Sequence, residues 1–114
     1  MFDPHTLHLA ARIGHYLHWK RGGKAQEFLV RLEAFFSPIY RGGDFKEQLK
    51  YLVHPAEPRP LDEGLFQEIR KRFNPFQINQ LLFFLDQITH RQEPQPLEEL
   101  VYLRDLYEKL LVEG

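Results

Sequence analysis

Cysteine is missing from this chain of 114 residues, and hydroxyl side chains are scarce. Ser37, Thr6 and Thr89 are the only serine and threonine residues, and Ser37 stands directly before a proline. Disulfides, thiol chemistry and thiolate metal sites are therefore excluded. The sequence also lacks a glycine-rich phosphate loop and a histidine–glutamate motif with metalloprotease spacing. We expect a protein that is not an enzyme and that uses no cofactor.

Long apolar runs are lacking as well. No uninterrupted apolar stretch approaches the roughly 20 residues that a membrane span requires. The first ten residues, MFDPHTLHLA, do not have the basic and then apolar pattern of a signal peptide. We therefore expect a cytoplasmic protein with no membrane partner. Met1, Asn74 and Asn79 are the only methionine and asparagines, which is typical of thermophilic proteins, although eight glutamines oppose that interpretation.

A strong excess of either charge is absent, since the formal net charge is −1. The whole chain therefore has no general attraction for nucleic acid or membrane. Residues 1–50 carry eight Lys and Arg against five Asp and Glu, a balance of +3, whereas residues 51–114 carry seven against eleven, a balance of −4. This asymmetry permits either a basic face on the first half or a head-to-tail contact between two copies.

Apolar side chains at helical spacing are abundant. Hydrophobic residues make up 43% of the chain, with 10 Phe, 5 Tyr and 1 Trp, and their spacing follows the period of an α-helix and not the alternation of a strand. The sequence predicts an all-α fold, a compact bundle of five to six short helices that forms a single domain over residues 1–114. The predicted helices cover residues 4–20, 24–36, 45–53, 61–73, 75–90 and 97–112.

Capping residues and glycines mark the ends of these helices. Asp3 and Asn74 each precede a proline, as an N-cap before a proline at the first helical position does. Gly-Gly at 22–23 stops the first helix, and Asp44 with Glu47 resembles a capping box that opens the third. The residues predicted to face the core are Leu9, Ala10, Ile13, Tyr16, Leu17, Phe28, Leu32, Phe35, Phe36, Phe45, Leu49, Leu52, Leu65, Phe66, Ile69, Phe73, Ile78, Leu81, Leu82, Leu85, Ile88, Leu100, Leu103, Tyr107 and Leu110.

The segment HYLHWKRGGK, residues 15–24, carries the densest chemistry of the chain. If Ile13 points to the core, a turn of 100° per residue gives the first helix a second stripe on the opposite side. Histidines and a tryptophan there are not typical of a face that meets only water, so we expect a partner surface whose association weakens in acid. The residues of this stripe assigned to the surface are His8, His15, His18 and Trp19.

Histidine pairs raise the alternative of a metal site. His5 with His8, and His15 with His18, are spaced by three residues, so each pair could offer two nitrogens to one ion. Zinc requires about four ligands, and no cysteine is present to complete the set. We therefore favour solvated or interface histidines over a metal centre.

Cations near the tryptophan raise the alternative of nucleic-acid binding. Cations beside a stackable ring are typical of single-stranded nucleic-acid sites, and the third helix could extend the patch if it folds back beside the first turn. Against this, the sequence pI is about 6.6, and cations at helix C-termini are common because they complement the helix dipole. The predicted contacts are Lys20, Arg21, Lys24, Arg41, Lys46 and Lys50.

The helix predicted over 75–90 is apolar on two sides. Phe76 and Phe83 lie opposite its core face, together with amide side chains in place of charges. Such a helix is either central in the bundle or part of an interface. The sequence alone leaves both interpretations open.

These patterns predict a protein that works by binding. The first hypothesis is a non-catalytic protein-interaction or assembly subunit that self-associates, through the histidine and tryptophan stripe or through the side of Phe76 and Phe83. The alternative is a small helical subunit that binds RNA or single-stranded DNA. Salt separates the two, because phosphate contacts weaken steeply as ionic strength rises.

Overall fold

The fold is all-α, as the sequence predicts, in a computed structural model that describes residues 1–52, 60–89 and 108. A short 3₁₀ turn, η1 (Ser37–Ile39), follows the second helix. The helix predicted over 97–112 lies outside the described residues, except for Glu108, which is helical. The α-helices with bounds in the described residues are α1 (Pro4–Lys20), α2 (Ala25–Phe36), α3 (Phe45–Leu52), α4 (Glu63–Arg72) and α5 (Pro75–Thr89).

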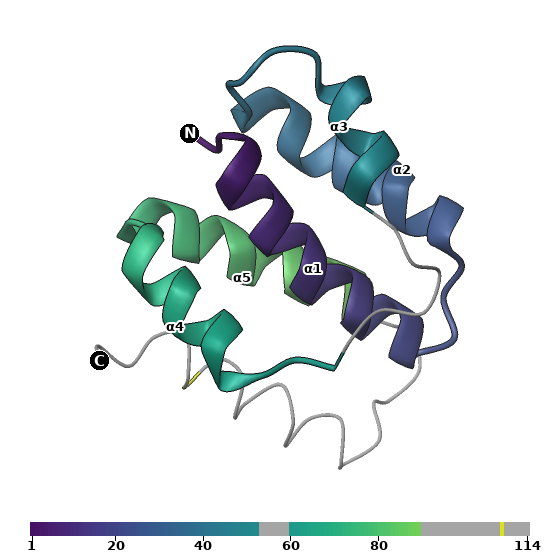
Figure 1. Cartoon of the computed structure of the whole chain (residues 1–114). Helices are drawn as coiled ribbons and strands as arrows, with labels where there is room; N and C mark the ends of the chain where they lie inside the picture. The colour runs from purple at the N-terminus through teal and green to yellow at the C-terminus, as the bar shows by residue number, and fades with distance from the viewer. Residues whose placement is uncertain (53–59, 90–107, 109–114) are drawn as a thin grey trace.

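The first helix lies at the centre of this arrangement. Figure 1 shows α1 crossing the middle of the molecule, with α2 and α3 on one side, α4 on the other and α5 behind it. All four of these helices contact α1. The buried residues of α1 consequently occupy a little more than half of its circumference: Thr6, Leu7, Ala10, Ala11, Ile13, Gly14, His15, Leu17 and His18.

The caps at the starts of α1 and α5 are formed as predicted. Asp3 Oδ1 accepts a hydrogen bond from the Thr6 N–H at 2.8 Å, and Thr6 Oγ1 accepts from the Asp3 N–H at 3.0 Å. Asn74 and Gln77 make the same reciprocal pair at the start of α5. The Gln77 Nε2 also donates to the Met1 carbonyl at 2.7 Å, which fastens the N-terminus to this corner. Each cap satisfies helix-end N–H groups that would otherwise lack a partner.

The core includes two phenylalanines that the helical spacing did not place there. Phe2 is fully buried, and its ring packs edge-to-face against Phe36 at 4.9 Å and Phe73 at 5.7 Å. Its backbone accepts from the Arg41 N–H and donates to the Ile39 carbonyl, each at 2.7 Å, so two strand-like bonds tie the N-terminus to the segment after η1. Phe84 of α5 is also fully buried, beside the predicted core residue Leu85, whereas the predicted Leu82 is half-buried.

The start of α4 differs from the prediction. The helix begins at Glu63 and not at Leu61, because Asp62 is the N-cap and its Oδ1 accepts from the Leu65 N–H at 2.8 Å. The side chains predicted to face the core from this helix are nevertheless buried: Leu65, Phe66, Ile69 and Phe73.

Among the described residues, no helix has both the length and the apolar composition needed to cross a bilayer.

Gly14 lets three helices approach closely in the middle of the core. A Cβ at this position would lie 2.8 Å from Phe84 Cε2 and 3.0 Å from Phe28 Cε1, so α2 and α5 both press an aromatic ring onto the α1 backbone. A glycine inside a helix costs roughly 0.5–1 kcal/mol relative to alanine, and here the two ring contacts occupy the space that a methyl group would need.

We expect Gly14→Ala to destabilise the protein by about 1–3 kcal/mol, because the overlap with two buried rings outweighs the better helix propensity of alanine. Gly64→Ala is the matched control. A Cβ at Gly64 meets only Asp62 Oδ1, at an ordinary 3.4 Å, so this change should be neutral or stabilise α4. Chemical denaturation followed by circular dichroism measures both. Equal effects of the two substitutions would contradict the close packing at Gly14.

Candidate functional site

The glycine pair in residues 15–24 ends α1 with a Schellman motif. The Gly22 N–H donates to the Trp19 carbonyl and the Gly23 N–H donates to the His18 carbonyl, each at 2.9 Å. Gly22 has φ = 81°, the left-handed conformation that glycine adopts without strain. The segment is therefore a helix stop that reverses the chain into α2.

The His18 ring closes over this stop. Its Nε2 lies 3.1 Å from the Lys24 carbonyl, so the ring donates a hydrogen bond to the first residue after the turn. A Cβ at Gly23 would overlap the ring, which explains why the second position of the pair is also glycine. His18 is 7% exposed, so its chemistry serves the α1–α2 connection.

His15 lies in the same buried layer, against α2. It is 5% exposed, and its ring stacks on Phe28 with centroids 5.5 Å apart and an interplanar angle of 27°. The His18 ring lies 5.8 Å from the same Phe28. The prediction of an outer face for His15 and His18 is therefore wrong: the side opposite Ile13 does touch something apolar, but it is the chain's own second helix.

Burial lowers the pKa of both histidines below the ordinary value of 6.5. For His15 the main cause is loss of water around the charged ring, and the neighbouring His18 adds to it. For His18, burial again dominates; Arg31 and Arg21 also disfavour its charge, while Glu27 and the carbonyl that its ring contacts favour it. Both imidazoles are consequently held neutral in the folded state near neutral pH.

The other two residues of the predicted stripe are placed differently. His8 is half-buried, and its Nε2 lies 3.0 Å from Gln48 Oε1 of α3. Trp19 is exposed at the end of α1, 6.1 Å from the Tyr16 ring, and the Lys20 ammonium lies 5.8 Å from that same ring. The four residues His8, His15, His18 and Trp19 therefore do not form one accessible surface.

The predicted basic residues are spread along the molecule. Lys20, Arg21 and Lys24 lie at or just after the end of α1, whereas Arg41 bonds to Phe2 before its start. A helix of 17 residues is about 25 Å long. The guanidinium nitrogens of Arg21 are shielded from solvent. The side chain of Lys50 lies outside the described part of the chain. Lys20, Arg21, Lys24, Arg41 and Lys46 therefore do not form one continuous patch. Nucleic-acid binding stays a prediction.

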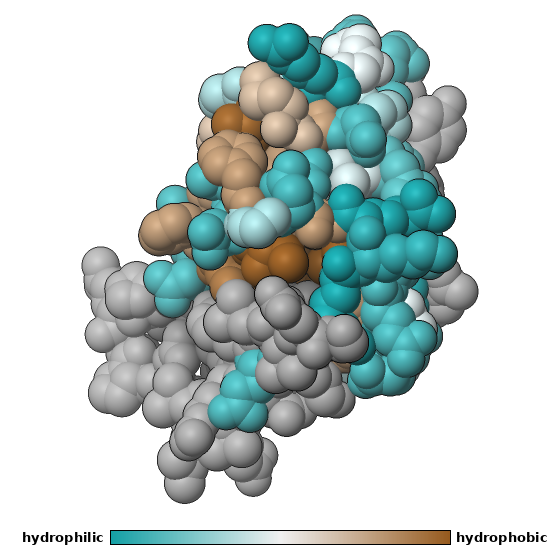
Figure 2. Space-filling view, turned by 90° about the vertical axis from the view of Figure 1, so that its left-hand side faces the viewer, coloured by the Kyte–Doolittle hydropathy of each residue, from teal (hydrophilic) through white to brown (hydrophobic). Residues whose placement is uncertain are grey.

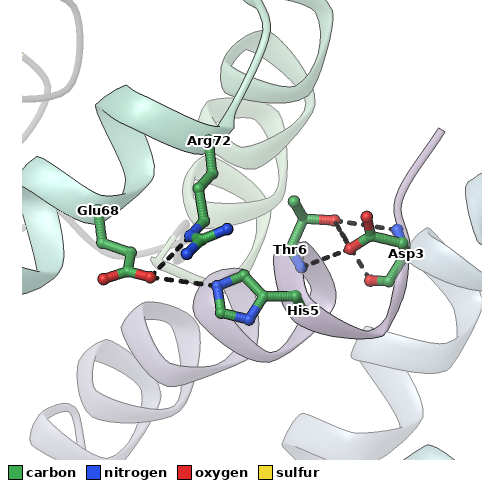
Figure 3. A network of polar contacts seen from close by, with 5 residues as sticks. All are labelled: Asp3, His5, Thr6, Glu68 and Arg72. Atoms are coloured by element: carbon green, nitrogen blue, oxygen red, sulfur yellow. Dashed lines mark hydrogen bonds and ion pairs between the residues drawn. The ribbon is translucent and has the colours of Figure 1, made fainter.

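An exposed polar network joins α1 to α4, as Figure 3 shows. Glu68 accepts from Arg72 Nε at 2.7 Å and lies 3.2 Å from His5 Nε2. The hydrogen bond from Arg72, followed by that from His5, lowers the pKa of the Glu68 carboxyl. Exposed pairs of this kind contribute little to stability, so the network adds little to the contact between α1 and α4.

A shallow groove beside this network is lined by Asp3, His5, Thr6, Lys71 and Arg72. Its acidic side chain, Asp3, already caps α1 through Thr6, which lowers the pKa of the Asp3 carboxyl. Within residues 1–52, 60–89 and 108, no three His, Asp or Glu side chains come together in a way that could hold a metal ion.

The exposed side of α5 is the apolar surface that the structure leaves open. Leu81, Phe84 and Leu85 of this helix are buried, whereas Phe76 is 46% exposed and Phe83 is 62% exposed. They are seven residues apart, so they lie on one side of the helix about 10 Å from each other. We call this side, with Asn79 and Gln80 between the two rings, the α5 outer face. The interpretation of α5 as the central helix of the bundle does not apply, because α1 is the central helix.

The surface around the N-terminus and the α4–α5 connection is mixed in character. Figure 2 shows apolar residues reaching the surface on the left and in the centre of the view, with hydrophilic residues on the right. Among the described residues, the other large exposed apolar side chains include Val30 on α2, which is 70% exposed. It has no second aromatic or apolar anchor on its own face of the helix, and scattered exposures of this kind are ordinary.

Comparison with known proteins adds no relative: no family model, no curated protein and no solved structure matches the chain.

The buried histidines predict that the fold itself loses stability in acid. Their pKa values are lowered in the folded state, so the unfolded chain binds protons more tightly once the pH falls below about 6.5. The contribution of these two histidines to stability should be complete well above that pH and should be lost progressively as the pH falls below it. Denaturant midpoints measured on both sides of about pH 6.5 test the expectation.

His15→Leu should make the decline shallower, because one of the two groups that take up protons on unfolding is removed. His8→Gln is the control, and it should change the decline less than His15→Leu does, because His8 is half-buried whereas His15 is 5% exposed. An equal slope in the wild type and in His15→Leu would show that His15 does not contribute.

Proposed function

We propose that this protein is a non-catalytic protein-interaction or assembly subunit that binds its partner through the α5 outer face. We also propose a cytoplasmic location, as expected from the sequence. The observation that supports the binding role most directly is the exposure of Phe76 and Phe83 on one side of a helix whose other side is core.

Two aligned aromatic rings are an effective anchor for a partner. Burial of a phenylalanine side chain that was fully exposed to water stabilises a contact by about 1.5–3 kcal/mol. Aromatic residues also dominate the binding energy of many interfaces. A solitary exposed ring is common, but two rings two turns apart form a continuous stripe that one partner can cover.

The composition of α5 supports the same role. Asp86 is the only charged residue among the 15 residues of this helix, although charged residues make up 27% of the chain. The positions between and beside the rings are amides, Asn79, Gln80 and Gln87. Charged side chains are depleted at the centres of interfaces, because their desolvation is costly. Amides lose less on burial when they find hydrogen-bond partners.

A photoreactive benzoylphenylalanine at position 83, with the protein expressed in its own cells, tests the proposal. We expect ultraviolet light to join the protein to one defined partner through the photoreactive residue, and the yield to fall when excess untagged wild-type protein competes. Excess Phe83→Asp should not compete, because a charge at the centre of an apolar contact is not tolerated.

Val30 provides the matched control for this experiment, since it is apolar and 70% exposed on α2. The photoreactive residue at position 30 should give no defined product, and excess Val30→Asp should compete like the wild type. Phe83→Asp should keep its helical signal and change the unfolding free energy by no more than about 0.5 kcal/mol, as for a surface site. Equal cross-linking at positions 30 and 83 would exclude a specific α5 contact.

A further inference from the structure

The order of side chains along the α5 outer face is nearly the same from either end of the helix. Its four residues are Phe76, Asn79, Gln80 and Phe83, with spacings of three, one and three. The two rings are therefore equidistant from the midpoint between residues 79 and 80, and an amide lies on each side of it. Phe76, Asn79 and Phe83 are exposed, and Gln80 is half-buried.

A twofold axis through that midpoint would superpose the face on itself. We infer that the partner of the α5 outer face is a second copy of this chain, with the two α5 helices antiparallel about this axis. The inference rests on the proposed binding role of the face and names its occupant. In this arrangement Phe76 packs against Phe83 of the partner subunit, and the reverse contact repeats it, as a closed isologous interface requires.

The amides make the centre of this contact complementary. A carboxamide has both donor and acceptor atoms, so Asn79 can exchange two hydrogen bonds with Gln80 of the partner subunit. The axis repeats this pair, and the four amides then satisfy one another as the rings exclude water. The same charge at both positions would instead bring like charges together, because residues 79 and 80 of the two copies meet around the axis.

The charges near the ends of α5 favour the antiparallel direction. Lys71 and Arg72 end α4 four and three residues before α5 begins, whereas Asp86 lies in its last turn. An antiparallel pair brings Asp86 of each copy towards Lys71 of the other, which is attractive and is partly offset by Arg31, whose guanidinium donates to the Gln87 carbonyl at that end of α5. A parallel pair would bring the two basic ends together.

The size of the face predicts a weak dimer. With a phenylalanine surface of about 200 Å², exposures of 46% and 62% leave roughly 200 Å² of ring surface per copy. A standard stable interface buries about 800 Å² per partner. We therefore expect a reversible dimer that forms at micromolar or higher concentrations of protein.

Sedimentation equilibrium of the purified protein tests the stoichiometry. The weight-average mass should rise with concentration from 13.7 kDa towards twice that value. Phe83→Asp should remain at the monomer mass at every concentration, and Val30→Asp should behave as the wild type. If Phe83→Asp loses its helical signal, Asn79→Arg serves the same purpose, because it places two like charges at the axis.

The absence of cysteine lets single cysteines report the geometry without interference. For antiparallel helices, Asn79→Cys lies beside the axis and should form a disulfide-linked dimer under mild oxidation. Gln87→Cys should not, because the two copies of residue 87 would be about 22 Å apart. Ala34→Cys, exposed on α2, gives the background of random collisions.

The outcomes separate the inference from the proposed function. Cross-linking at both 79 and 87 would indicate parallel helices and overturn the arrangement. A monomer mass at all concentrations, with cross-linking at 79 no higher than at 34, would overturn self-association. If position 83 still gave its defined photoproduct in cells, that result would leave the binding role intact and assign it to another protein.

Discussion

The contact of α1 with Phe28 and Phe84 is possible because residue 14 has no side chain. The contacts of α1 with α2 and with α5 meet at this point in the described core. This close approach holds α2 and α5 against the same helix, and it brings α1 to the centre, where α3 and α4 also reach it. More than half of the circumference of α1 is therefore buried, so the residues there must be apolar or must satisfy their polar atoms inside the protein.

The buried histidines are the consequence of this constraint. His15 and His18 flank Phe28, and the His18 ring secures the turn by which α2 returns along α1. A neutral imidazole fulfils such a role well, since it offers a flat apolar surface together with one N–H donor. The segment with the densest chemistry in the sequence thus holds the fold together, and the same burial couples its stability to protons.

The fifth helix divides its surface between two tasks. One side places Leu81, Phe84 and Leu85 in the core, and the opposite side presents Phe76 and Phe83 to solvent. Because the two sides do not share residues, the outer one can change without loss of the core contacts. This separation is what makes a binding role for the α5 outer face testable by single substitutions.

Local sequence patterns determined the class of fold and most helix ends. N-caps at Asp3 and Asn74 and the glycine stop at 22–23 act within a few residues, so the sequence carries their whole physical cause. Side-chain period also identified most core positions. Only the tertiary structure decided which helix is central, and with it the fate of His15 and His18. Periodicity gives the angle between two stripes on a helix, but how many neighbours cover that helix depends on contacts between segments distant in the chain, such as those of Phe84 at Gly14.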